Sequence, residues 1–263
     1  MGSMDRAFER LYNFDFPGAH RNIDQFISEN PNDPFGYAIR SSAYLFYELD
    51  RLAILDAEFF ADDEKIADKR KKLEPDPALK AKLFKATEDS QTRAKALLKQ
   101  DPNHVNALFA MCITEGVITD YTALVEKKQF KSLSTVKTSA AYGAHLLKIQ
   151  PTFYDAYVTT GLADYLIGSL PFFVRWFVRI EHVSGDKSAG IDKLKLVAEK
   201  GRFFKPFAKI LLSIAYLREK QPTKAQTHLA ELKRQFPENP LFQREYVRVS
   251  AKLQSGELKD QDR

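Results

Sequence analysis

The sequence has a single cysteine, Cys112, among its 263 residues. One thiol excludes a disulfide framework, and it excludes a metal site built from cysteines of one chain. The compartment stays open, because such a chain suits the cytoplasm and equally suits an exported protein whose signal segment has been removed. Cys112 occupies a small-residue position in the helical pattern described below, so we expect a packed core thiol rather than a nucleophile.

Signatures of catalysis are missing as well. The chain contains no P-loop, no dinucleotide-binding glycine motif and no nucleophile elbow. Its histidines are not spaced as metal ligands and do not pair with Cys112 in the sequence. These histidines are His20, His104, His145, His182 and His228. We therefore predict no catalytic residue, no metal site, no cofactor and a protein that is not an enzyme.

The chain also lacks a strong charge of either sign. The chain has 40 Lys and Arg residues and 35 Asp and Glu residues, which gives a net charge of only +5. So small an excess does not indicate nucleic-acid binding. The sequence pI of ≈ 9.0 favours anionic partners or surfaces without identifying any. We expect a protein or peptide partner and no nucleic acid, and the composition leaves the oligomeric state open.

Linkers rich in glycine and serine are absent, which favours one continuous body. Hydrophobic residues make up 44% of the chain, enough for a sizeable core. We interpret residues 1–4 as a cloning remnant and leave them out of the fold. Residues 5–255 are predicted to form a single helical-repeat domain, and residues 256–263 a polar C-terminal tail.

Apolar residues recur at helical spacing, while the alternation typical of strands is rare. Prolines mark where helices end, because the residue before a proline avoids the α conformation. Such prolines are Pro31, Pro102, Pro151 and Pro237. The pattern predicts helices over residues 35–60, 77–100, 103–126 and 130–150. We expect His104 and Asp186 to lie at helix starts, with Asp186 capping a helix over 187–200.

The segments before these prolines share one pattern, in which a small residue is followed by two apolar ones. Before Pro237 the series is Ala225, Leu229 and Leu232, which places all three side chains on one helical stripe. The small residue allows a neighbouring helix to approach closely. We expect the same of Gly161, which lies in the helix that follows Pro151. Equivalent series are Ala19, Ile23, Phe26 before Pro31; Ser90, Ala94, Leu97 before Pro102; and Ser139, Gly143, Leu146 before Pro151.

These series resemble the tetratricopeptide repeat (TPR) family, whose unit is about 34 residues of helix–turn–helix. Ser213 and Tyr216, upstream of Ala225, match the first helix of such a unit. The resemblance covers most of the chain and implies an all-α fold, a TPR-like right-handed α-solenoid of stacked antiparallel helix hairpins. The distances between Pro31, Pro102 and Pro151 exceed one unit, so the middle hairpins are predicted to be lengthened.

A narrower resemblance lies within residues 169–195. There Leu170 and Pro171 precede an apolar segment, which is followed by Gly185-Asp186, Gly190 and Leu194. This progression is similar to the tetratricopeptide-39 and inclusion-body-clearance family. Membership would imply a helical-repeat protein at the surface of an organelle.

The first helix of each hairpin lines the concave face of a solenoid, and here the repeat spacing puts mostly apolar side chains there. The mapped positions are Phe35, Ala38, Ser42, Asn106, Phe109, Ile113, Asp155, Val158, Leu162, Phe207, Ile210 and Ile214. Chaperone-binding TPR proteins instead carry Lys, Arg and Asn, which clamp a peptide carboxylate. We therefore predict a non-enzymatic scaffold or adaptor that binds an apolar or amphipathic segment. Its partner-binding residues are predicted to be Phe109, Ile113, Val158, Leu162, Ile210 and Ile214.

An alternative is that the chain's own extra residues, supplied by the long middle hairpins, fill this groove. A second site is suggested by the apolar segment 170–180, in which Arg175 and Arg179 share one stripe. Its aromatic residues Phe172, Phe173, Trp176 and Phe177 suit contact with a partner or a membrane surface, and they equally suit burial in the core. The alternative function is thus a peripheral membrane or hydrophobic-ligand binding protein.

Overall fold

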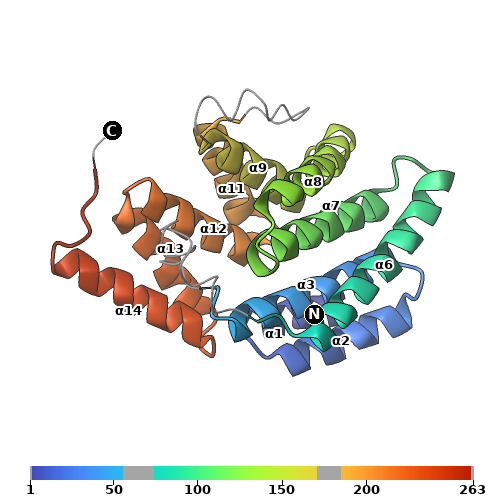
Figure 1. The fold of residues 1–263 in the computed structure, drawn as a ribbon, viewed down its shortest axis with the longest axis horizontal. Coiled ribbons are helices and arrows are strands. Elements are labelled where there is room, and N and C mark those ends of the chain that lie inside the picture. The colour runs from blue at the N-terminus through green and yellow to red at the C-terminus, as the bar shows by residue number, and fades with distance from the viewer. Residues whose placement is uncertain (1, 56–73, 171–184, 262–263) are drawn as a thin grey trace.

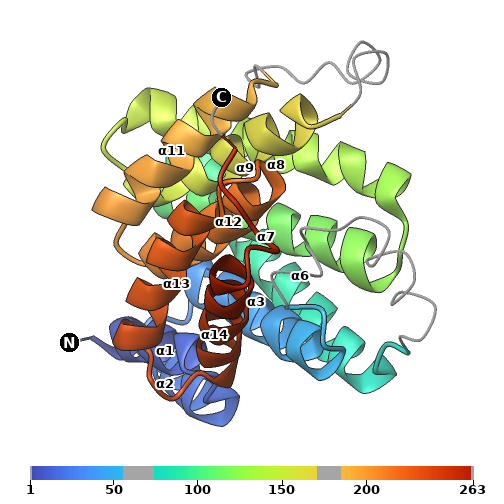
Figure 2. The same cartoon turned by 90° about the vertical axis from the view of Figure 1, so that its left-hand side faces the viewer.

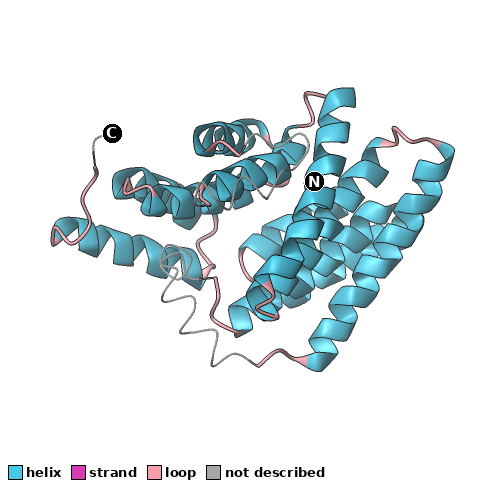
Figure 3. Ribbon diagram, turned by 45° about the horizontal axis from the view of Figure 1, so that its top comes forward, coloured by secondary structure: helices cyan, strands magenta, loops and turns pink. Residues whose placement is uncertain are grey.

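The computed structural model describes residues 2–55, 74–170 and 185–261. In these ranges the chain forms eleven α-helices and no strand (Figure 3). The predicted all-α fold class is therefore confirmed for the described residues.

The helices, in chain order, are α1 (Ser3–Tyr12), α2 (Phe16–Glu29), α3 (Pro34–Arg51), α6 (Pro77–Gln100), α7 (Val105–Asp120), α8 (Gln129–Ile149), α9 (Tyr157–Gly168), α11 (Lys187–Lys200), α12 (Lys205–Arg218), α13 (Pro222–Gln235) and α14 (Pro240–Gln254). A π-helical turn, Tyr121–Val125, continues α7, and a short 3-10 helix, Tyr154–Ala156, precedes α9.

Helices adjacent in this order pack as pairs, and the pairs stack on one another (Figure 1). The pairs are α1 with α2, α3 with α6, α7 with α8, α9 with α11, and α12 with α13, while α14 packs on α13. The middle helices are long: α6 has 24 residues and α8 has 21, against 14 in each of α12 and α13.

Short polar side chains set where several helices begin. Asp33, Asp76 and Asn239 each precede a proline, and each side chain accepts hydrogen bonds from backbone N–H groups in the first turn. The predicted caps are confirmed: His104 Nδ1 accepts from Ala107 N at 3.3 Å, and Asp186 accepts from Ser188 N at 2.7 Å.

The helix predicted over residues 35–60 was wrong at its C-terminal end. Helix α3 stops at Arg51 because Ala53 adopts a positive φ of 53°, a left-handed conformation that cannot continue a right-handed helix. Residues 56–60 lie outside the described residues. The helices predicted over 77–100, 103–126 and 130–150 correspond to α6, to α7 with its π-helical turn, and to α8. Their ends differ by no more than a few residues.

The first helix includes residues that precede the predicted domain boundary. Ser3 and Met4, assigned to a cloning remnant, belong to α1 and are buried. The Ser3 hydroxyl donates to the Glu29 carboxylate at 3.2 Å, which ties α1 to the end of α2. The helical body therefore begins at Ser3 rather than at residue 5.

Two glycines allow α9 and α11 to cross at backbone contact. A Cβ atom at Gly190 would lie 2.6 Å from the backbone nitrogen of Tyr165 and 2.7 Å from the carbonyl oxygen of Gly161. A Cβ atom at Gly161 would lie 2.9 Å from Lys193 Cβ. Real contacts are not this short, so the crossing requires glycine in both helices. The small residue Ala225 is likewise fully buried.

The C-terminal end of α1 meets the turn between α13 and α14, and Figure 2 views the molecule from the side on which α14 lies in front. The Tyr12 hydroxyl donates to Phe203 O at 2.9 Å, and Asn239 Nδ2 donates to Tyr12 O at 2.7 Å. The Tyr12 and Phe236 rings are 5.3 Å apart. One hydrophobic core consequently runs from Met4 to Phe242.

Val105–Val125 is long and apolar enough to cross a membrane by length and composition, with a mean hydropathy of 1.4. Its apolar window is 61% buried inside the protein, where α7 packs against α3, α6 and α8. Packing in the protein core accounts for this apolar character.

The glycine crossing gives a test of the packing. Replacing Gly190 with Ala, or Gly161 with Leu, should lower the free energy of unfolding by about 1–3 kcal/mol, because backbone atoms must separate. Urea denaturation measures this change. Gly116→Ala is the control, since its Cβ would meet nothing closer than 3.8 Å, and it should be neutral or stabilising. Equal stability of Gly190→Ala and the parent would contradict this packing.

Candidate partner-binding groove

Five phenylalanines meet where the N-terminal helices face the turn before α12. We call Phe8, Phe35, Phe109, Phe203 and Phe204 the aromatic plug. Ring centroids lie 4.8 Å apart for Phe8 and Phe203, 5.6 Å for Phe35 and Phe109, and 5.6 Å for Phe109 and Phe204. These separations suit attractive ring contacts. The plug thus joins α1, α3 and α7 to a turn almost 200 residues from α1 in the sequence.

Asp155 fixes the turn that supplies two rings of the plug. Its side chain is buried, and its carboxylate accepts hydrogen bonds from Phe203 N at 3.1 Å and Phe204 N at 3.0 Å. Each N–H would otherwise be a buried, unpaired donor. The repeat spacing mapped Asp155 to the concave face of the predicted solenoid. In the structure its carboxylate holds the turn that carries Phe203 and Phe204.

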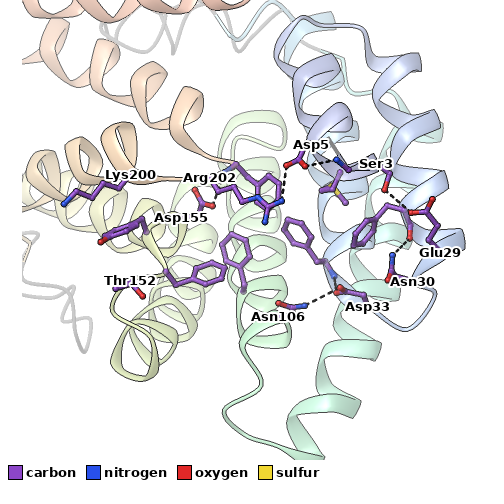
Figure 4. Close-up of a pocket in the computed structure, with 18 residues that line it drawn as sticks. Ser3, Asp5, Glu29, Asn30, Asp33, Asn106, Thr152, Asp155, Lys200 and Arg202 are labelled. Carbon is purple, nitrogen blue, oxygen red and sulfur yellow. Dashed lines mark hydrogen bonds and ion pairs between the residues drawn. The ribbon is translucent and has the colours of Figure 1, made fainter.

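A wide pocket of about 580 Å³ lies on one side of the plug, where α3 and α7 begin (Figure 4). Its floor is aromatic and its rim is polar. The rim carboxylates already have partners: Asp5 pairs with Arg202 at 3.2 Å, and Asp33 caps α3. We call this cavity the rim pocket. Glu29 accepts from Ser3 at 3.2 Å, and Lys200 lies over the Tyr154 ring.

A smaller and more apolar cavity of about 120 Å³ lies on the other side of the plug. We call it the apolar groove. Side chains from α1, α3, α7, α8, α9 and α12 line it. The groove also has an exposed edge, because Leu166 of α9 lines it and is 48% exposed.

The structure brings together three of the six predicted partner-binding residues. Ile113, Val158 and Leu162 line the apolar groove. Phe109 is part of the aromatic plug and lines the rim pocket instead. Ile210 and Ile214 line neither cavity, since Phe207 is the α12 residue that enters the groove and Ile210 packs against the core. Phe172, Phe173, Trp176 and Phe177 lie outside the described residues.

Sequence reasoning missed Asp120, the one acidic residue that lines the apolar groove. It continues the stripe of α7 formed by Phe109, Ile113 and Gly116, at the helical spacing of three and four residues. The prediction stopped at Ile113, although counting one further turn along this stripe would have reached the carboxylate. A π-helical turn, which often marks a functional site, begins at the next residue.

The Asp120 carboxylate has no hydrogen-bond or salt-bridge partner in the part of the chain that the structure describes. The residue keeps some contact with solvent, but its surroundings disfavour the ionised form. This desolvation raises the pKa of Asp120 to about 7. A carboxyl with a perturbed pKa in a cleft is a candidate functional group.

Cys112 also lines the groove, and its chemistry is unlike that of a reactive thiol. The side chain is buried, and its Sγ atom lies 3.1 Å from Thr159 Oγ1. Burial raises the pKa of the thiol to about 11, so it stays protonated at neutral pH. The predicted packed core thiol is confirmed. Among the described residues, no cluster of three or more His, Cys, Asp and Glu side chains could hold a metal ion.

Comparisons with protein-family models, with curated proteins and with solved structures found no match to this chain. The groove and its residues are therefore interpreted from their geometry and chemistry.

The raised pKa of Asp120 predicts a pH-dependent stability. Because the folded state holds the proton more tightly than the unfolded state, ionisation opposes folding as the pH rises from about 4 to about 7. Asp120→Asn should therefore raise the free energy of unfolding by about 1–3 kcal/mol at pH 8, and by little at pH 4. Urea denaturation at both pH values compares the two proteins. A constant difference between them would show that Asp120 has an ordinary pKa.

Proposed function

We propose that this protein is a non-enzymatic scaffold that binds an apolar or amphipathic segment of a partner protein in the apolar groove. In this proposal the stacked helix pairs form a TPR-like right-handed solenoid. The first helices of the pairs form its inner face, and the groove is the open part of that face.

The packing of small residues supports the TPR-like architecture. The first residues of the four series, Ala19, Ser90, Ser139 and Ala225, are all buried, and the hydroxyls of Ser90 and Ser139 donate to Pro34 O and Cys112 O of neighbouring helices, each at 2.8 Å. These residues belong to the series that precede Pro31, Pro102, Pro151 and Pro237, so the repeated small residues lie at close helix contacts.

The single observation that carries the binding proposal is the apolar groove with its exposed edge at Leu166. Much of the remaining inner face is occupied by the aromatic plug, whose rings come from α1, α3, α7 and the turn before α12. The rings of the plug are not the extra residues of the middle hairpins, so filling of the groove by those residues remains the alternative to this proposal. A cavity of about 120 Å³ suits an anchoring side chain from a partner rather than a whole ligand.

The polar groups of the groove do not favour catalysis. A general acid or base needs a second reacting group within hydrogen-bond reach. The hydroxyls beside Asp120 are already engaged: Thr119 donates to Glu115 O at 2.8 Å, and Ser139 donates to Cys112 O at 2.8 Å. A lone carboxylate in an apolar setting suits recognition better than acid–base chemistry.

The membrane alternative depends on segment 170–180, which lies mostly outside the described residues. Liposome co-sedimentation distinguishes the two functions, because a scaffold of this kind remains in the supernatant while a peripheral membrane protein sediments with the lipid.

The groove can be tested with a displayed library of amphipathic helical peptides of about 18 residues, or five turns. The parent protein should enrich peptides with a continuous apolar stripe. Leu166→Asp should weaken their binding about tenfold or more, because it places a charge at the apolar edge of the groove.

Val247→Asp is the matched control for this experiment. Val247 lies on α14, is 53% exposed and does not line the groove, so its replacement should leave peptide binding unchanged. Equal binding by both variants, or enrichment of peptides without an apolar stripe, would overturn the proposed function.

A further inference from the structure

We propose that the segment bound in the apolar groove carries a lysine or arginine beside its apolar anchor, and that this cation pairs with Asp120. The inference rests on the proposed function and specifies the chemistry of the partner: an amphipathic helix whose apolar face contains one basic residue.

The groove contains a single unmatched polar group among the described residues. The other polar side chains that line it have partners within the protein. Ser42 donates to Ala38 O at 3.1 Å, Tyr12 donates to Phe203 O at 2.9 Å, and Thr159 donates to Ala156 O at 3.1 Å. Thr119 and Ser139 are engaged as described above. Asp120 alone offers the groove a free acceptor.

Two fully buried carboxylates elsewhere in the described residues are matched with cations. Asp164, fully buried in α9, pairs with Lys193 of α11 at 2.5 Å. Glu48, also fully buried, pairs with Arg51 at 2.8 Å. Asp120 has no such cation among the described residues, and in this proposal the bound segment supplies it.

The energetics select a cation over other groups. A carboxylate among apolar side chains has lost hydration, and a desolvated charge interacts with an opposite charge more strongly than an exposed one does. Desolvation alone perturbs the pKa of Asp120, in keeping with the absence of a nearby compensating charge. An ammonium or guanidinium group on a bound segment would supply that charge, whereas a neutral group would leave the carboxylate unmatched.

The position of Asp120 beside an apolar edge favours a helix as the occupant. Leu166 of α9 and Asp120 at the end of α7 line the same groove, and in this proposal one ligand presents an apolar side chain to the first and a cation to the second. Residues three or four apart on a helix present neighbouring side chains in this way. Helices commonly bind grooves through such anchors. The cavity is too small for the body of a helix, so the helix would lie across the groove.

The rim pocket does not offer an equivalent site. It is larger and has more acidic residues, but Arg202 already neutralises Asp5, and Asp33 is used to cap α3. A basic ligand at Asp5 would have to displace Arg202.

The experiment uses the same displayed peptide library with one position of the apolar stripe varied among Lys, Arg, Met, Gln and Glu. Selection on the parent protein should enrich Lys or Arg at that position. Selection on Asp120→Asn should remove this preference while keeping the apolar stripe. The variant removes an unfavourable buried charge, so it should fold at least as stably as the parent, and circular dichroism verifies that it does.

A matched pair of synthetic peptides, differing only by Lys or Met at that position, then measures the pairing. The parent should bind the Lys peptide about tenfold or more tightly, and Asp120→Asn should bind both peptides about equally. Equal binding of the two peptides by the parent would overturn the pairing with Asp120. So would a preference for Lys that survives in Asp120→Asn.

The Leu166→Asp variant separates failure of this inference from failure of the proposed function. If both peptides bind the parent equally and Leu166→Asp weakens both, the groove is a binding site and the cation pairing is wrong. If Leu166→Asp has no effect, or no peptide is selected, the proposed function fails and the inference fails with it.

Discussion

The aromatic plug is the contact on which the rest of this structure depends. Helix pairs that touch only their neighbours along the chain leave the two ends of the molecule unconnected. Here Phe8 of α1 stacks on Phe203, and Asp155 holds the turn that carries Phe203 and Phe204. These contacts join the first helix to the last third of the chain, and rings of the plug line both the rim pocket and the apolar groove. The two cavities are consequently separated by aromatic packing inside the protein.

Charge in the interior follows a consistent rule, and Asp120 departs from it. Removing a carboxylate from water costs free energy that a nearby cation or hydrogen-bond donors can offset. Asp164 and Glu48 receive cations, and Asp155 receives two backbone N–H groups. In the described residues Asp120 receives neither, in a groove whose other polar groups are satisfied. A carboxyl group whose pKa is perturbed in a cleft is a candidate functional group.

Much of the fold could be predicted because its information is local. The spacing of apolar residues predicts helices, prolines and polar caps set their ends, and Asp186 and His104 cap as expected. The prediction failed where local preference does not decide the outcome. The residue type of Ala53 does not predict its left-handed conformation, which ends α3. The burial of Ser3 and Met4 depends on α2 being beside them. The helical stripe also placed Ile113, Val158 and Leu162 on one face, and the structure brings them to one cavity.

The sequence by itself determined the all-α class, most helix boundaries, the close-packing positions such as Gly161, and the apolar residues Ile113, Val158 and Leu162 that line one cavity. Each of these follows from residues within a few turns of one another. Only the tertiary structure decided which inner positions stay accessible. Phe109 is covered by rings from α3 and the turn before α12, while Leu166 keeps an exposed edge and Asp120 lacks a partner among the described residues. These outcomes depend on contacts between residues as far apart as Phe8 and Phe203, and the spacing of residues along a helix does not encode such contacts.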